Sequence, residues 1–142
     1  MRIETANFLE ALIFANEETN EDLSGASIYE FHLDFINAAD YFVYKFMEYL
    51  SDKGVSGDDL ETLQRSFGGN VYFSLSGHGC GFWDDSSDLG KTVNEHLIAF
   101  SRNEYRFEQI QIGKRRGKLD LAFKVKFVDK YRKAMFYEGL AI

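Results

Sequence analysis

The part of the chain richest in chemically versatile side chains is the run at residues 76–85, SGHGCGFWDD. It places the imidazole of His78 two residues before the thiol of Cys80, among alternating glycines. Since residues i and i+2 face the same side of an extended segment, His78 can act as general base toward a Cys80 nucleophile. Asp84 could then orient the imidazole. One interpretation is therefore a small enzyme or ligand-binding protein that uses the Gly-rich loop 76–85.

Two other kinds of site are not supported by the spacing. A phosphate-binding G-x-G-x-x-G loop needs glycine where this chain has Phe82, and no G-x-x-x-x-G-K-[ST] sequence is present. The chain has one cysteine and neither H-x-x-x-H nor C-x-x-C spacing, which argues against a zinc site. We therefore expect neither a metal nor a cofactor.

The same loop also suits a structural or a partner-binding role. Its glycines permit a tight irregular turn, Phe82 and Trp83 can fill the core, and Asp84, Asp85 or Asp88 can cap the next helix. An exposed tryptophan beside an aspartate is instead typical of a hot spot for protein binding. The candidate partner-binding residues of the loop are His78, Phe82, Trp83 and Asp84.

The elements that position this loop follow from hydrophobic periodicity. Helical spacing and capping signals predict helices at residues 5–15, 28–52, 56–66, 88–101 and 128–138. Alternation of apolar and polar residues predicts strands at 70–76, 105–112 and 118–127, with a turn at 113–117. The expected fold is a single α+β domain over residues 1–142, in which a small antiparallel or mixed sheet of about three strands packs against three to five helices.

The longest of these helices, 28–52, has both a start signal and a buried stripe. Ser27 and Glu30 have the spacing of a capping box. Apolar residues then recur at helical spacing, and we expect them in the core: Phe31, Phe35, Ala38, Ala39, Phe42, Phe46, Tyr49 and Leu50.

Composition limits the class of protein. The chain has 142 residues, of which 45% are hydrophobic and 16% aromatic, and such a composition excludes a disordered chain. No apolar run reaches the roughly 18–20 residues that span a bilayer, and no secretory signal opens the sequence. We expect a soluble cytoplasmic protein without a membrane partner.

The charge is negative and unevenly distributed. The net charge of −7 argues against a general nucleic-acid binder. Residues 1–70 hold fourteen of the 23 acidic residues but only four of the 16 basic ones. Four carboxylates gather in the polar loop 16–25, and they are candidate partner-binding residues: Glu17, Glu18, Glu21 and Asp22.

The basic residues gather near the C-terminus, within residues 114–133. They can form a solvated strand face, pair with the acidic half of the chain, or contact phosphate. With Tyr105, Phe107 and Tyr131 nearby to stack on bases, a nucleic-acid-binding module is a further alternative. Its candidate residues are Lys114, Arg115, Arg116 and Lys118.

The run GHGCGFWDD, followed by DLGKTVNEHL, resembles a G-H-G-x-G-F-W-D-R motif followed by a Leu-Gly helix. This motif marks a family of small uncharacterised proteins encoded by tailed bacteriophages and some plasmids. The resemblance covers residues 70–123, and the chain departs from it at Asp85, where the family has arginine, and in its more basic C-terminal segment.

The resemblance implies a phage or plasmid origin and brings no reaction with it. Small acidic proteins from such sources commonly bind host machinery, and some imitate the negative surface of DNA. The expected function is therefore that of a non-enzymatic accessory protein in the cytoplasm of a bacterial host cell. It would bind and modulate a host protein, in host takeover or anti-defence. The sequence does not predict an oligomeric state.

Overall fold

The structure of the protein, a computed structural model, describes residues 1–63, 65–77, 81–85, 87–115, 118–128 and 134–138. Beyond Glu104 it describes the course of the backbone. His78 and Cys80 therefore lie outside the described residues, as do Arg116 and Tyr131.

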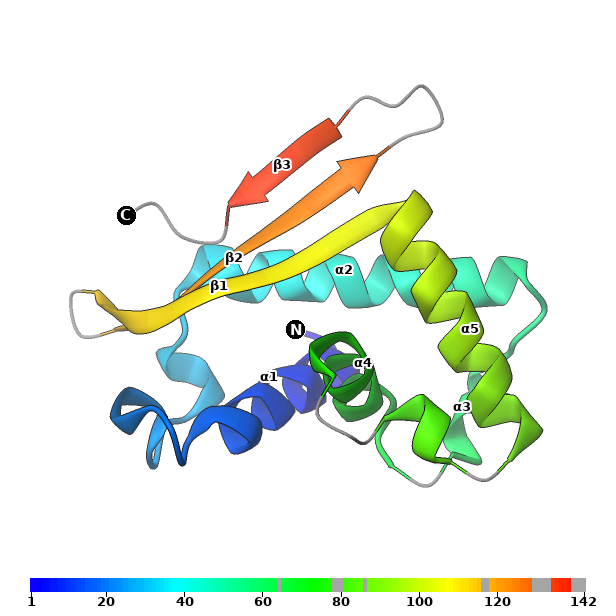
Figure 1. The fold of residues 1–142 in the computed structure, drawn as a ribbon, viewed down its shortest axis with the longest axis horizontal. Helices are drawn as coiled ribbons and strands as arrows, with labels where there is room; N and C mark the ends of the chain where they lie inside the picture. Colours follow the sequence, from blue (N-terminus) through cyan, green and yellow to red (C-terminus); the bar gives the residue numbers. More distant parts are fainter. Residues whose placement is uncertain (64, 78–80, 86, 116–117, 129–133, 139–142) are drawn as a thin grey trace.

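Helices and 3₁₀ turns make up most of the described chain before Tyr105. In Figure 1, α2 crosses the middle of the molecule, α1 and α4 lie below it, and α5 crosses near one end. The helices and 3₁₀ turns are α1 (Ile3–Asn16), η1 (Glu21–Leu23), η2 (Ile28–Glu30), α2 (Leu33–Asp52), α3 (Gly57–Glu61), α4 (Phe67–Ser76), η3 (Phe82–Asp84) and α5 (Asp88–Asn103).

The expected α+β class, in which a strand at 70–76 belongs to a three-stranded sheet packed against the helices, is wrong. The described residues up to Glu104 are 75% helical and include no strand, so the fold is mostly helical. One expected strand, 70–76, lies inside α4. The Ser66 hydroxyl accepts a hydrogen bond from the Gly69 backbone nitrogen at 3.2 Å, and Gly77 ends the helix with a φ of 71°. These caps define a helix, although the run NVYFSLS has the aromatic and β-branched composition of a strand.

Beyond Glu104 the backbone follows three antiparallel strands in the order β1-β2-β3. Their bounds are β1 (Tyr105–Arg115), β2 (Lys118–Val128) and β3 (Ala134–Glu138). Tyr105 pairs with Phe127, Arg115 pairs with Lys118, and the register shifts between Gln109 and Gln111. The expected helix at 128–138 is wrong for residues 134–138, which form β3.

Aromatic side chains from four elements meet in the core. Phe46 of α2 stacks on Phe67 of α4 with ring centroids 5.7 Å apart. It also packs against Phe82 of η3 at 6.5 Å and Phe100 of α5 at 5.2 Å. This arrangement confirms the helical aromatic stripe as core, because Phe35, Phe42, Phe46 and Leu50 are all buried.

The predicted helix 28–52 is divided in two by its own capping. The capping box of Ser27 and Glu30 is confirmed, but it caps the single turn η2. A second N-cap follows at His32, whose Nδ1 accepts a hydrogen bond from the Asp34 backbone nitrogen at 3.2 Å. The long helix therefore begins at Leu33 rather than at residue 28.

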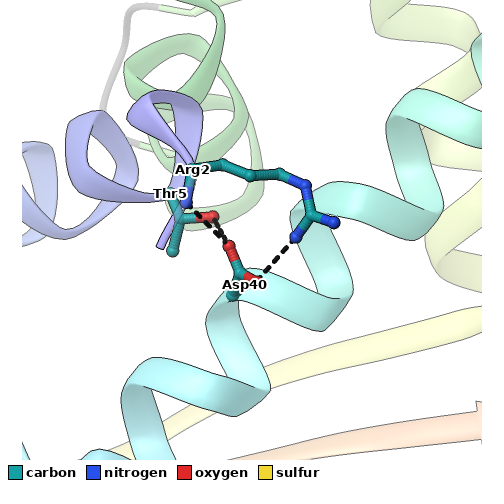
Figure 2. A network of polar contacts seen from close by, with 3 residues as sticks. All are labelled: Arg2, Thr5 and Asp40. Carbon is teal, nitrogen blue, oxygen red and sulfur yellow. Dashed lines mark hydrogen bonds and ion pairs between the residues drawn. The ribbon is translucent and has the colours of Figure 1, made fainter.

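One carboxylate ties α1 to α2 (Figure 2). Asp40 of α2 accepts hydrogen bonds from the Thr5 hydroxyl and the Arg2 guanidinium, each at 2.6 Å, and from the Arg2 backbone nitrogen at 3.2 Å. Partial burial by itself raises the pKa of Asp40, but the hydrogen bonds from Thr5 and Arg2 outweigh it and hold the pKa below its ordinary value.

Asp40→Asn is expected to lower the free energy of unfolding at pH 7 by on the order of 1–2 kcal/mol, because it removes an ionised acceptor from a half-exposed network. Folding lowers the pKa of Asp40, so its stabilisation is complete above about pH 4 and is lost as the pH falls through the lowered pKa. Urea unfolding at several pH values should show the two proteins converging in acid. Asp52→Asn, at an exposed position of α2, is the control, and a difference that stays constant with pH would contradict the assignment.

Candidate functional site

The acidic loop, residues 17–22, is held at both ends by the core. At its start, the Asn16 side-chain amide donates to the Leu12 carbonyl and to the Tyr72 hydroxyl, both at 2.8 Å. Burial raises the pKa of the Tyr72 phenol, so this acceptor is neutral at pH 7. At the far end, the side chain of Leu23 is fully buried.

Within the loop, the carboxylates face outward. Glu17, Glu18 and Glu21 are exposed, while Asp22 is half-buried. The side-chain oxygen of Asn20 accepts a hydrogen bond from the Asp22 backbone nitrogen at 3.0 Å and so caps η1. The loop therefore presents its negative charges from a backbone that is fixed by hydrogen bonds and one apolar anchor.

An open apolar groove of about 450 Å³ adjoins this loop, between the outer face of α1 and the segment that leads into η2. Three apolar side chains on it face solvent: Ile3 is 69% exposed, Phe14 70% and Tyr29 73%. Among the described residues that line the groove, the charged ones are both carboxylates. The lining comprises Ile3, Ala6, Glu10, Ile13, Phe14, Glu17, Ala26, Ser27, Ile28 and Tyr29.

Sequence reasoning named the acidic loop but missed the groove. The sequence predicts a helix at residues 5–15, and Phe8, Leu9 and Leu12 of this helix pack into the core. Phe14 lies on the opposite side and is exposed. The missed signal is that α1 carries apolar residues around its whole circumference. This pattern is typical of a fully buried helix, but one face of α1 is exposed, so some of its apolar residues face solvent.

A second open pocket, of about 540 Å³, lies where α1, α3 and the segment before α4 meet. Its walls mix apolar side chains with the charges of Glu4, Asp58, Glu61 and Arg65. Arg65 forms an ion pair with Asp84 at 3.2 Å, so this pocket lacks the uniform negative charge of the groove.

The Gly-rich motif divides into an inner and an outer half. Phe82 has no exposed surface and packs on Phe67 at 5.6 Å between ring centroids, so it belongs to the core. Trp83, the next residue, is 50% exposed. Of the two aromatic residues considered for partner binding, only Trp83 has a surface that a partner can reach.

The described backbone at residues 81–85 of the motif is fixed by close contacts. The Phe82 backbone nitrogen donates to the Ser74 hydroxyl at 3.0 Å, and a Cβ on Gly81 would collide with that hydroxyl. Asp85 is buried and accepts from the backbone nitrogen and the hydroxyl of Ser87, at 2.9 and 2.5 Å. Ser87 in turn caps α5, so Asp85 supports the cap rather than forming it.

Of the three candidate catalytic residues, only Asp84 is among the residues that the structure describes. This carboxylate is exposed and its described partner is Arg65, not an imidazole. His78 and Cys80 lie outside the described residues. In the described part of the chain, no group of three or more His, Cys, Asp or Glu side chains could hold a metal ion.

Three of the four candidate nucleic-acid residues lie at one end of the β1–β2 pair. The backbone register pairs Lys114 with Leu119 and Arg115 with Lys118, which brings three of the four basic positions to one end of the sheet. The fourth, Arg116, is outside the described residues.

None of the described helices combines the length and the apolar character that a bilayer span requires. No protein-family model matches the chain, and neither a curated protein nor a solved structure is significantly similar to it.

Proposed function

We propose that this protein is a non-enzymatic accessory protein of a phage or plasmid, and that it acts in the bacterial cytoplasm by binding a host protein. The observation that carries the proposal is the position of the acidic loop beside the apolar groove. Glu17 belongs to both features, since it lies in the loop and lines the groove. The exposed carboxylates and the exposed apolar side chains thus form one continuous surface.

The two parts of this surface contribute differently to binding. Carboxylates at the rim of an interface speed association with a basic partner and orient it. Buried contacts of aromatic side chains supply most of the affinity. Because the loop is anchored at Asn16 and Leu23, binding orders little additional backbone and loses little of the gain to conformational entropy.

The partner in this proposal has a basic surface, as the DNA-binding sites of host defence or replication enzymes do. Fourteen acidic residues in the first 70 positions support such a target, and a surface that imitates DNA is one form of it. Twelve of the sixteen basic residues lie after position 70, and they make the likeness to DNA local, confined to the acidic loop and its surroundings.

A pull-down from host lysate tests the proposal. The tagged wild-type protein should retain one host protein stoichiometrically after nuclease treatment, and less of it at high salt. The variant Glu17→Lys/Glu18→Lys should lose it. The matched control is Glu95→Lys/Glu104→Lys, which makes the same change of charge at exposed positions of and just after α5.

Two outcomes would contradict the proposal. If the loop variant retains the host protein as well as the control does, then the acidic loop is not the binding surface. If nuclease releases everything that is retained, the protein binds nucleic acid, and the basic segment 114–133 becomes the better candidate.

A further inference from the structure

The groove beside the acidic loop has the dimensions of a short helix. Ile3 and Phe14 both line it from α1, and eleven residues of α-helix separate them by roughly 16 Å. Tyr29 lines the same groove from η2, which contacts α1. The three exposed side chains therefore form an elongated apolar track about three helical turns long.

Charge decides what can occupy this track. Glu10 and Glu17 lie along it, and the exposed Glu18 and Glu21 continue the negative charge beyond its end. None of the described residues that line the groove is basic. An acidic or neutral apolar segment would bring no compensating charge to these carboxylates, whereas a segment with lysine or arginine on its flanks pairs with them.

We infer that the groove binds an amphipathic helix of the partner protein, with an apolar face of about three turns and basic residues along its edges. The inference rests on the proposed function, and it names the part of the host protein that is recognised. It corresponds to the helix-in-groove mode, in which side chains at i, i+3, i+4 and i+7 insert between the apolar residues of the receptor. Phe14 and Tyr29 are the receptor residues that such anchors would contact.

A model peptide tests the inference directly. The probe is a fluorescein-labelled peptide of sixteen residues, with leucine at i, i+3, i+4 and i+7 spacing and lysine elsewhere. Two control peptides carry glutamate in place of lysine, or the same residues in scrambled order. Fluorescence anisotropy should show binding of the Lys/Leu peptide, weaker binding of the scrambled peptide and none of the Glu/Leu peptide.

Receptor variants locate the binding. Phe14→Ala and Tyr29→Ala should each weaken binding of the Lys/Leu peptide roughly tenfold, as hot-spot residues do. Both side chains are largely exposed, so the variants should unfold at the wild-type temperature. Ile98→Ala, at an exposed apolar position of α5, is the matched control and should bind as wild type does. Equal binding by all four proteins would overturn the inference, and so would equal binding of the scrambled peptide.

The same variants separate this inference from the proposed function. If Phe14→Ala and Tyr29→Ala retain both the peptide and the captured host protein, while the Glu17→Lys/Glu18→Lys variant loses the host protein, the groove inference fails and the proposed function stands. If the wild-type protein captures no host protein but binds the peptide through Phe14 and Tyr29, the proposed function fails and the groove inference stands.

Discussion

Replacing Phe82 with alanine is expected to lower the free energy of unfolding by about 3–5 kcal/mol, as it does for other fully buried phenylalanines. The ring has no exposed surface and packs against both Phe46 and Phe67, which belong to different helices. Its removal leaves a cavity where α2, α4 and the motif meet. Because Phe82 also anchors the Gly-rich loop, the backbone around it should lose its fixed position.

Trp83→Ala is the matched control, since the two residues are adjacent and both aromatic. Trp83 is half exposed, and its replacement should change the free energy of unfolding by only about 0.5 kcal/mol. Urea unfolding followed by circular dichroism gives the free energy of unfolding of both variants. Circular dichroism is used because the Trp83→Ala variant has lost the tryptophan whose fluorescence would otherwise report unfolding. If Phe82→Ala were as stable as Trp83→Ala, the placement of Phe82 in the core would be wrong.

This contrast bears on what the Gly-rich motif is for. Phe82, Gly81 and Asp85 all have structural partners, so their residue types follow from packing and capping. Trp83 has no such requirement in the described contacts, although an exposed tryptophan leaves a large apolar surface in water. A Trp83→Ala variant that is stable but binds its partner less tightly would assign the outer half of the motif to binding.

The helices with strong amphipathic patterns could be predicted from the sequence. The stripe from Phe35 to Leu50 identified α2 because its apolar residues repeat at helical spacing. The start of α2 was misplaced because Ser27 and Glu30 form a real capping box, and only the structure shows a second cap at His32 five residues later. Local signals thus predicted the element but not which of two valid starts the chain would use.

The prediction failed at α4 because tertiary packing overrides local propensity there. The sequence predicts a helix that ends at residue 66 and a strand at 70–76, with Gly68-Gly69 between them. In the structure both glycines lie in the first turn of the helix, where Gly68 lets α4 approach the backbone of α1. The reason for a glycine at this position is a neighbouring helix sixty residues away in the sequence, which no local pattern reveals.

The candidate site was predicted in part for a similar reason. The acidic loop is visible as a run of carboxylates between two apolar segments, so Glu17, Glu18, Glu21 and Asp22 could be named. The groove depends on which face of α1 the other helices cover. Phe8 and Phe14 are alike in the sequence, and only the packing of α2 and α4 buries one and exposes the other.

Gly68→Ala is expected to destabilise the protein by at least about 2 kcal/mol, even though alanine is the better helix former by nearly 1 kcal/mol. A Cβ at this position would overlap the Glu4 carbonyl oxygen and lie 2.9 Å from the Phe8 backbone nitrogen. These are backbone atoms of α1, so no side-chain rotation can relieve the collision. The two helices would have to separate, and the contacts of the surrounding core would be lost with them.

Gly57→Ala provides a control of opposite sign. Gly57 begins α3, and a Cβ there would meet nothing within 4 Å, so alanine should stabilise the protein by about 0.4–1 kcal/mol through its unfolded state. Thermal unfolding measures the stability of both variants. A Gly68→Ala variant as stable as the wild-type protein, or more stable, would contradict the close crossing of α1 and α4.

Since α1 also carries Ile3, Phe14 and the start of the acidic loop, a shift of α1 should weaken partner binding by the Gly68→Ala variant, while the Gly57→Ala variant should bind normally. The close contact at Gly68 therefore fixes both the fold and the position of the proposed binding surface.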